Sequence, residues 1–120
     1  MLAFGACRGE RGGDAEVRAA LARLPAPPPE LRGGEEAYRR QCAGCHGPNA
    51  VGTEKGPPLA HRYYEPSHHA DASFLLAVRN GVAAHHWRFG DMPAQPQVGD
   101  DEVKAITAYV RWVQREVGIR

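Results

Sequence analysis

The pattern of apolar and polar positions along the chain predicts helices and no strands. Apolar residues recur every three or four positions in several stretches, whereas alternation of apolar and polar residues is nowhere long enough for a strand. The strongest pattern begins at Asp100. Its apolar positions have helical spacing: Val103, Ile106, Val110, Val113 and Val117. The first four of these are expected to lie in the core. The predicted fold class is therefore all-α.

Two shorter helices are predicted ahead of this one. Residues 35–42 begin with two glutamates, which favour the first turn of a helix because they interact with the positive end of its dipole. Residues 71–80 begin with an aspartate suited to capping a helix, and the Asn-Gly pair at their end is typical of a helix C-terminus. The Gly- and Pro-rich stretch 47–58 should be irregular, and residues 82–99 are predicted to form a long loop.

The composition changes near residue 33. Residues 14–24 have helical spacing with an aspartate cap, and the proline-rich run 25–29 should end that helix and form a stiff linker. We therefore assign residues 1–33 to an N-terminal extension and residues 34–120 to a compact helical domain. Three helices and long loops bury little apolar surface for a domain of this size. We therefore expect the core of this domain to need further stabilisation, such as that given by a large bound cofactor.

The charge balance excludes one class of function. The 120 residues include 15 Lys and Arg and 14 Asp and Glu, which gives a formal net charge of +1. A nucleic-acid binder that depends on bulk positive charge is excluded by this balance. No stretch approaches the ~20 apolar residues that a membrane-spanning helix needs. The three cysteines are an odd number, which argues against a closed disulfide framework.

Two of the cysteines belong to a motif that carries chemistry. Cys42-Ala43-Gly44-Cys45-His46 is a C-x-x-C-H sequence, the attachment sequence of c-type haem. Two thiols at this spacing can form thioethers with the two vinyl groups of one porphyrin edge, and the histidine is placed to bind the iron. Zinc is an alternative, but it needs two further ligands, for which His61, His68 or His69 are the candidates. A thioredoxin-type redox pair would require a βαβ setting, and none is predicted.

Four segments in sequence order resemble those of the class I cytochrome c family over nearly all of residues 34–120. They are Gly34-x-x-x-Tyr38-x-x-x-Cys42, Gly56-Pro57-Pro58-Leu59, Gly90-Asp91-Met92-Pro93 and Ile106-x-x-Tyr109. The resemblance implies a cytochrome c fold, with about three main helices around one covalently bound haem c per chain. It also implies that the first and last of these helices cross at the glycine and the aromatic residues. The Pro57 carbonyl would accept a hydrogen bond from the His46 imidazole.

Met92 is the expected second axial ligand of the iron. The resemblance places it in the ligand loop, and the only other methionine is Met1. His85 or His86 would be the alternative, giving bis-histidine ligation. The side chains that could donate hydrogen bonds to the haem propionates are Arg62, Tyr63, Trp87 and Arg88. Leu59 is a predicted haem contact, and further pocket walls are predicted at Phe74, Leu75, Val78 and Phe89.

These residues predict one-electron transfer by a carrier in a respiratory or periplasmic chain. The iron would cycle between ferric and ferrous with both axial positions filled, so no substrate would bind it, and the chain would be no enzyme. Two alternatives stay open: a haem domain with a labile sixth ligand acting as sensor or peroxidase, or the electron-entry subunit of a larger oxidoreductase. We expect a monomer that docks redox partners weakly and transiently at the haem edge.

The N-terminal residues and the family resemblance together indicate where the protein is located in the cell. Family members receive their haem outside the bacterial cytoplasm, so the resemblance implies a periplasmic or otherwise extracytoplasmic protein. Residues 1–6 look like the tail of a signal sequence, and Gly5-Ala6-Cys7 resembles the end of a lipoprotein signal. Cys7 would then carry a lipid and tether the domain to a membrane. The alternative is an incidental thiol.

Overall fold

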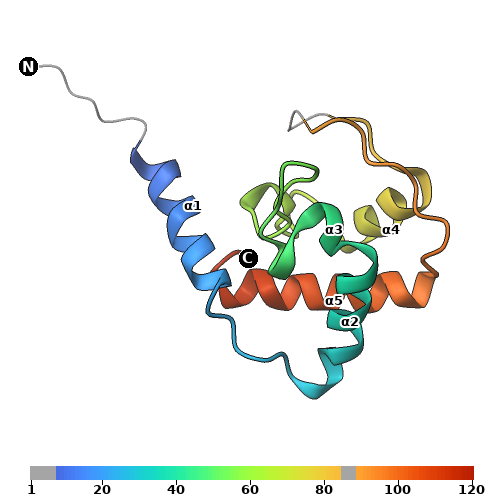
Figure 1. Cartoon of the computed structure of the whole chain (residues 1–120), viewed down its shortest axis with the longest axis horizontal. Helices are drawn as coiled ribbons and strands as arrows, with labels where there is room; N and C mark the ends of the chain where they lie inside the picture. Colours follow the sequence, from blue (N-terminus) through green and yellow to red (C-terminus); the bar gives the residue numbers. More distant parts are fainter. Residues whose placement is uncertain (1–7, 85–88) are drawn as a thin grey trace, which may run out of the picture.

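The chain forms helices joined by long irregular segments (Figure 1). The structure is a computed structural model that describes residues 8–84 and 89–120, and of residues 8–14 the backbone alone. Its α-helices are α1 (Arg8–Leu21), α2 (Arg32–Gln41), α3 (Ala43–His46), α4 (Asp71–Asn80) and α5 (Asp100–Glu116). Single 3₁₀ turns occur at Pro29–Leu31, Pro48–Ala50 and Arg62–Tyr64. These ranges contain no strand, only the isolated bridges Thr53–Gly56 and Val82–Met92, so the all-α prediction is confirmed.

The crossing of α2 and α5 forms the centre of the core. The α5 residues that the apolar pattern placed inside are buried, among them Val110 and Val113, which are fully inaccessible. Gly34 of α2 lies against the α5 backbone so closely that a Cβ atom there would be 2.2 Å from the Ala105 carbonyl oxygen. Beside this contact the rings of Tyr38 and Tyr109 meet with centroids 5.4 Å apart. The glycine therefore permits the close approach, and the aromatic rings fill the space next to it.

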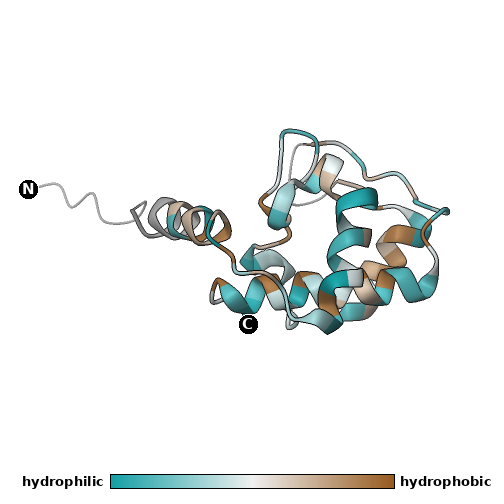
Figure 2. Cartoon of the chain, turned by 60° about the horizontal axis from the view of Figure 1, so that its bottom comes forward, coloured by the Kyte–Doolittle hydropathy of each residue, from teal (hydrophilic) through white to brown (hydrophobic). Residues whose placement is uncertain are grey.

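Along α5, apolar side chains recur at helical spacing on the buried face, and several polar side chains between them face solvent. Hydrophobic and hydrophilic bands therefore follow one another along the helix (Figure 2). Its first turn carries three acidic side chains, which are favourable at the helix N-terminus. No helix in the part of the chain that the structure describes is both long and apolar enough to cross a membrane.

Helix α4 coincides with the predicted stretch 71–80 and packs against α5 (Figure 1). The expected aspartate cap is wrong, because the N-cap is Ala70 and no side chain caps the helix. Asp71 lies in the first turn, where its carboxylate accepts from Arg111 of α5 instead. Gly81 ends the helix with a φ of 73°, as the predicted C-terminus requires.

The N-terminal helix differs from its prediction at both ends. It begins at Arg8 and not at Asp14, and it ends at Leu21 and not at Leu24. The helix includes three glycines, Gly9, Gly12 and Gly13, although a glycine in a helix interior costs about 1 kcal/mol relative to alanine. The last turn loosens ahead of the proline run, because a residue before proline disfavours helical geometry.

Helix α1 is joined to the domain that follows it. Leu21 is only 3% exposed and belongs to the central apolar cluster. Its carbonyl accepts a hydrogen bond of 3.0 Å from the Asn49 amide. The 34–120 boundary itself stays a prediction. In the stretch 47–58, the 3₁₀ turn at Pro48–Ala50 corrects the expectation of wholly irregular structure.

Candidate functional site

The C-x-x-C-H residues form a short helical turn at the end of α2. Cys42 ends α2 and begins α3, and its carbonyl accepts from the backbone nitrogens of Cys45, at 3.2 Å, and His46, at 2.9 Å. The Cys42 thiol is half-buried and the Cys45 side chain is exposed. The same turn therefore carries both free thiols and the His46 imidazole.

The His46 ring is oriented by a backbone carbonyl. Its Nδ1 donates to the Pro57 oxygen at 2.9 Å. Burial lowers the pKa of the imidazole, and the bond to Pro57 opposes that shift only in part. A neutral ring with its proton on Nδ1 has a lone pair on Nε2, which is the form that binds a metal.

The segment that supplies this carbonyl packs closely on the motif. A Cβ atom on Gly56 would lie 2.7 Å from the Cys45 carbonyl oxygen, so a larger residue would push the segment away. The Thr53 hydroxyl donates to that same oxygen at 2.6 Å. Leu59, the predicted haem contact, is half-buried and packs against the core.

The turn after His46 is attached to the crossing helices. The Tyr38 hydroxyl donates to the Gly47 carbonyl at 2.6 Å, and the Tyr109 hydroxyl reaches the Asn49 side chain at 3.4 Å. Burial raises the pKa of both phenols. Burial, with a smaller effect of the Glu102 charge, raises the pKa of the Cys42 thiol to about 11. That thiol is therefore protonated at neutral pH.

Met92 is held by backbone pairing to the end of α4. Its N–H and carbonyl both bond to Val82 at 2.9 Å, and the Gln95 N–H donates to the Val78 carbonyl at 2.7 Å. The Met92 side chain is half-buried. Its role as an axial ligand stays a prediction. The alternative ligands His85 and His86, and the suggested propionate donors Trp87 and Arg88, lie outside the described residues.

The donor set and its surroundings fit a covalently held haem. Two thiols and an oriented neutral imidazole lie on one turn, as thioether attachment and iron ligation require. The predicted apolar haem contacts are partly buried or exposed, which leaves apolar surface that a haem would cover: Leu59, Phe74, Leu75, Val78 and Phe89. Within residues 8–84 and 89–120, no three or more His, Cys, Asp or Glu side chains gather as metal ligands, so the zinc alternative gains no support.

The sequence analysis missed two polar residues near the site. Arg111 and Gln114 of α5 are only 6% and 1% exposed, and both bond to the segment that follows Pro57. The signal that was available was the position of Gln114, four residues after Val110 and thus on the buried face of the helix. Its polar character at that position requires partners in the fold.

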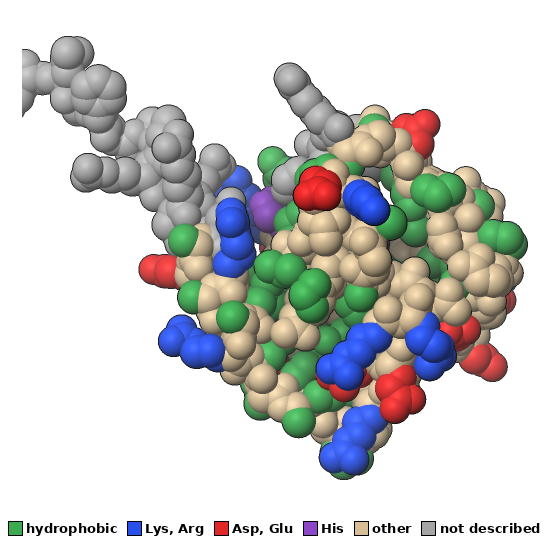
Figure 3. Space-filling view, viewed as in Figure 1, with side chains coloured by type: hydrophobic (Ala, Val, Ile, Leu, Met, Phe, Trp, Pro, Cys, Tyr) green, Lys and Arg blue, Asp and Glu red, His purple; other side chains and the backbone are tan. Residues whose placement is uncertain are grey.

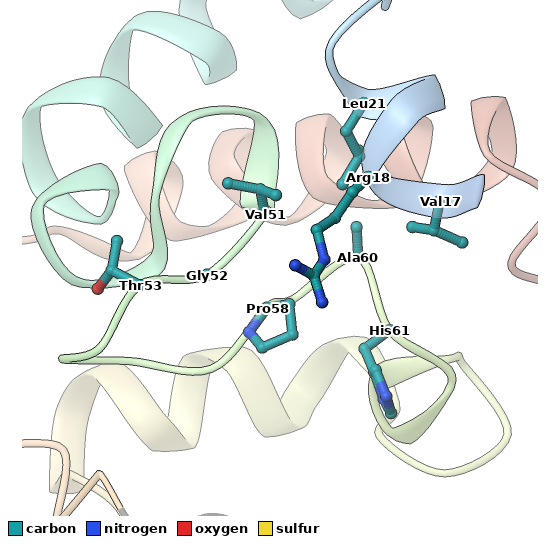
Figure 4. Close-up of a pocket in the computed structure, with 9 residues that line it drawn as sticks. All are labelled: Val17, Arg18, Leu21, Val51, Gly52, Thr53, Pro58, Ala60 and His61. Atoms are coloured by element: carbon teal, nitrogen blue, oxygen red, sulfur yellow. The ribbon is translucent and has the colours of Figure 1, made fainter. Parts of the chain in front are cut away.

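A separate cavity of about 320 Å³ lies between α1 and residues 51–61. Figure 4 shows the Arg18 side chain extending from α1 across it, towards Pro58 and His61. None of the predicted haem contacts lines this cavity, although Thr53, whose hydroxyl donates to the Cys45 carbonyl, does.

The family model described as Cytochrome c matches residues 31–114. No solved structure matches the chain.

Proposed function

Because the chain belongs to the cytochrome c family, we propose that it carries single electrons through one haem c attached to Cys42 and Cys45 and ligated by His46. The observation that supports this most directly is the 2.9 Å hydrogen bond from His46 Nδ1 to the Pro57 carbonyl. That bond aims the ring and increases the basicity of its other nitrogen. Haem-based electron transfer is the general function of the family, and the specific ligand set is our proposal.

Met92 would complete the iron coordination. When bound, the haem supplies a ferric–ferrous couple, and a thioether ligand raises its potential relative to bis-histidine ligation. The pairing of Met92 with Val82 fixes the backbone of the ligand loop against α4. Leu59, Phe74 and Val78 would exclude water from the iron, which also helps to set the potential.

The charge distribution supports weak docking of redox partners. Residues 34–120 contain ten Lys and Arg and ten Asp and Glu. On the face in Figure 3, basic and acidic side chains are interspersed. Long-range steering to a strongly charged partner would therefore be weak. We propose a monomer that docks transiently at the haem edge, either as a free carrier or as a subunit that passes electrons into a larger oxidoreductase.

We further propose that the protein works outside the cytoplasm, in a periplasmic or respiratory chain. The family resemblance supports this location, and the Gly5-Ala6-Cys7 sequence supports a lipid tether at Cys7. Metabolic labelling with a fatty-acid analogue, compared between the native chain and Cys7→Ser, tests the tether. Label that persists in Cys7→Ser would refute it.

The ligand set is tested by optical spectra of protein matured with haem, in both oxidation states, with and without carbon monoxide. A weak far-red ferric band and no response to carbon monoxide are expected. Met92→Leu should lose the band and bind carbon monoxide, whereas a control with both His85 and His86 changed to Ala should match the native protein. Carbon monoxide binding by the native protein would favour the sensor or peroxidase alternative instead.

A further inference from the structure

A buried arginine occupies the side of α5 that faces the segment after Pro57. Arg111 is 6% exposed, and a buried guanidinium is unfavourable unless its donors are satisfied. Its Nε donates to the Asp71 carboxylate at 2.8 Å, and its Nη1 donates to the Tyr64 carbonyl at 2.5 Å. Its Nη2 donates to the His69 carbonyl. The guanidinium carbon also lies 4.9 Å from the centre of the Phe74 ring.

Gln114, almost one turn further along α5, extends this arrangement towards the site. Its side-chain oxygen accepts from Arg111 Nη1 at 2.8 Å. Its amide nitrogen donates to the Leu59 carbonyl at 2.9 Å and to the Tyr64 carbonyl at 3.0 Å. The two side chains thus bond to four points between Leu59 and Asp71. Apart from the 3₁₀ turn Arg62–Tyr64 and a few local turn hydrogen bonds, this stretch has no regular structure, and the bonds from α5 add to its order.

The Leu59 end of this stretch is continuous with the carbonyl that orients His46. Pro57, which accepts from His46 Nδ1, precedes Leu59 by two residues. On one side Gly56 lies against Cys45, and on the other the Ala60 N–H donates to the Ala50 carbonyl at 3.1 Å. The Gln114 bond to Leu59 is the contact through which α5 holds this short segment against the motif.

We propose that Gln114, itself fixed by Arg111, is a positioning residue for the haem ligand His46. By fixing the Leu59 carbonyl it keeps the Pro57 carbonyl in place, and the Pro57 carbonyl sets the direction and basicity of the imidazole. The inference rests on the proposed function, because it takes His46 as the iron ligand. It predicts that a side chain on the last helix tunes the iron without touching it.

The test compares Gln114→Leu with Thr107→Val in the haem-loaded protein. Both positions are buried on α5, but the Thr107 hydroxyl donates only to Val103 of the same helix, at 2.8 Å. Thr107→Val therefore reports a buried polar change without a loop contact. The readouts are the reduction potential, the rate of solvent exchange of the His46 Nδ1 proton in the ferrous protein by NMR, and thermal unfolding.

Gln114→Leu should raise the potential, since a less basic imidazole stabilises the ferric state less. It should also speed exchange of the His46 proton by about five- to tenfold, the factor expected when one hydrogen bond of ordinary strength no longer supports the carbonyl. Thr107→Val should change neither readout. Equal responses of the two variants, an unchanged potential and exchange rate in Gln114→Leu, or a fall in its potential would overturn the proposal.

A second variant covers the case in which Gln114→Leu does not incorporate haem. Gln114→Glu still accepts from Arg111 but loses the two amide N–H donors. For this variant the exchange rate of the His46 proton decides the matter, because the added charge shifts the potential by itself. If native protein shows His46 ligation while both variants leave the exchange rate unchanged, the positioning role fails and the carrier function stands. If native protein shows no His46 ligation, the carrier proposal fails, and the positioning role with it.

Discussion

Replacing Gly34 by Ala should destabilise the protein, whereas the same change at the neighbouring Gly33 should not. A Cβ atom at Gly34 would lie 2.2 Å from the Ala105 carbonyl oxygen and 3.2 Å from the Tyr109 Cβ. Nothing lies within 4 Å of a Cβ at Gly33, and both residues are in α2. The pair therefore separates the effect of the helix crossing from the general effect of removing a glycine.

The magnitude follows from two opposing contributions. An atom placed at 2.2 Å must be moved by roughly 1 Å to reach ordinary contact, and overpacking of this kind costs about 1–3 kcal/mol. Ala favours the helix over Gly by up to about 1 kcal/mol at either position. Gly34→Ala should therefore lower the free energy of unfolding by about 2 kcal/mol, since the contact is with backbone that cannot rotate away. Gly33→Ala should raise it by about 0.5 kcal/mol.

Denaturant unfolding of the haem-loaded variants, followed by far-UV circular dichroism, measures both values. The slopes of the transitions should match that of the native protein, so that midpoint differences report stability alone. In thermal unfolding, Gly34→Ala should melt roughly 8 °C lower. The reasoning is refuted if Gly34→Ala proves at least as stable as Gly33→Ala.

Three further predictions concern polar groups. Tyr38→Phe should lower the free energy of unfolding by about 1–2 kcal/mol in denaturant titrations, because it removes the buried donor to the Gly47 carbonyl; a neutral effect would mean that water replaces the hydroxyl. The raised pKa values of Tyr38 and Tyr109 mean that the folded protein keeps protons that the unfolded chain releases. The stabilisation that these raised pKa values give is therefore fully present below about pH 10 and is lost as the pH rises above it, by up to about 1.4 kcal/mol per pH unit for each phenol. In Tyr38→Phe the free energy of unfolding should decline less steeply at alkaline pH. Arg79→Gln should change stability by less than about 1 kcal/mol, because Arg79 and Asp100 are about half exposed, and a salt titration that leaves this small difference unchanged would contradict an ionic origin.

The sequence predicts the helices and the motif well because both depend on local spacing. The apolar stripe from Val103 to Val113 predicts the buried face of α5, and the C-x-x-C-H spacing needs only one helical turn to bring its side chains together. Glycine at position 34 could be linked to the helix crossing only through resemblance to a family, since its use depends on a residue more than seventy positions away.

The parts that the sequence did not predict depend on tertiary partners. Periodicity shows which face of α5 is buried but does not name what Arg111 and Gln114 bond to. Asp71 has the local character of a helix cap, yet the guanidinium of Arg111 attracts its carboxylate in the fold. Likewise, nothing in residues 14–24 indicates that the Leu21 carbonyl meets Asn49.

The contact between Gly34 and Ala105 also governs when the protein can fold. It joins α2 to α5 and closes a loop of about seventy residues. The chain therefore loses the entropy of closing this loop before most of the core contacts have formed. During synthesis the α2 segment emerges long before α5. Until α5 follows, Tyr38 lacks its contact with the Tyr109 ring, and the turn after the C-x-x-C-H motif lacks the bond from Tyr109 to Asn49. The packing that α5 gives to α2, the helix that leads into the C-x-x-C-H turn, is therefore the last part of this arrangement to be completed as the chain is made.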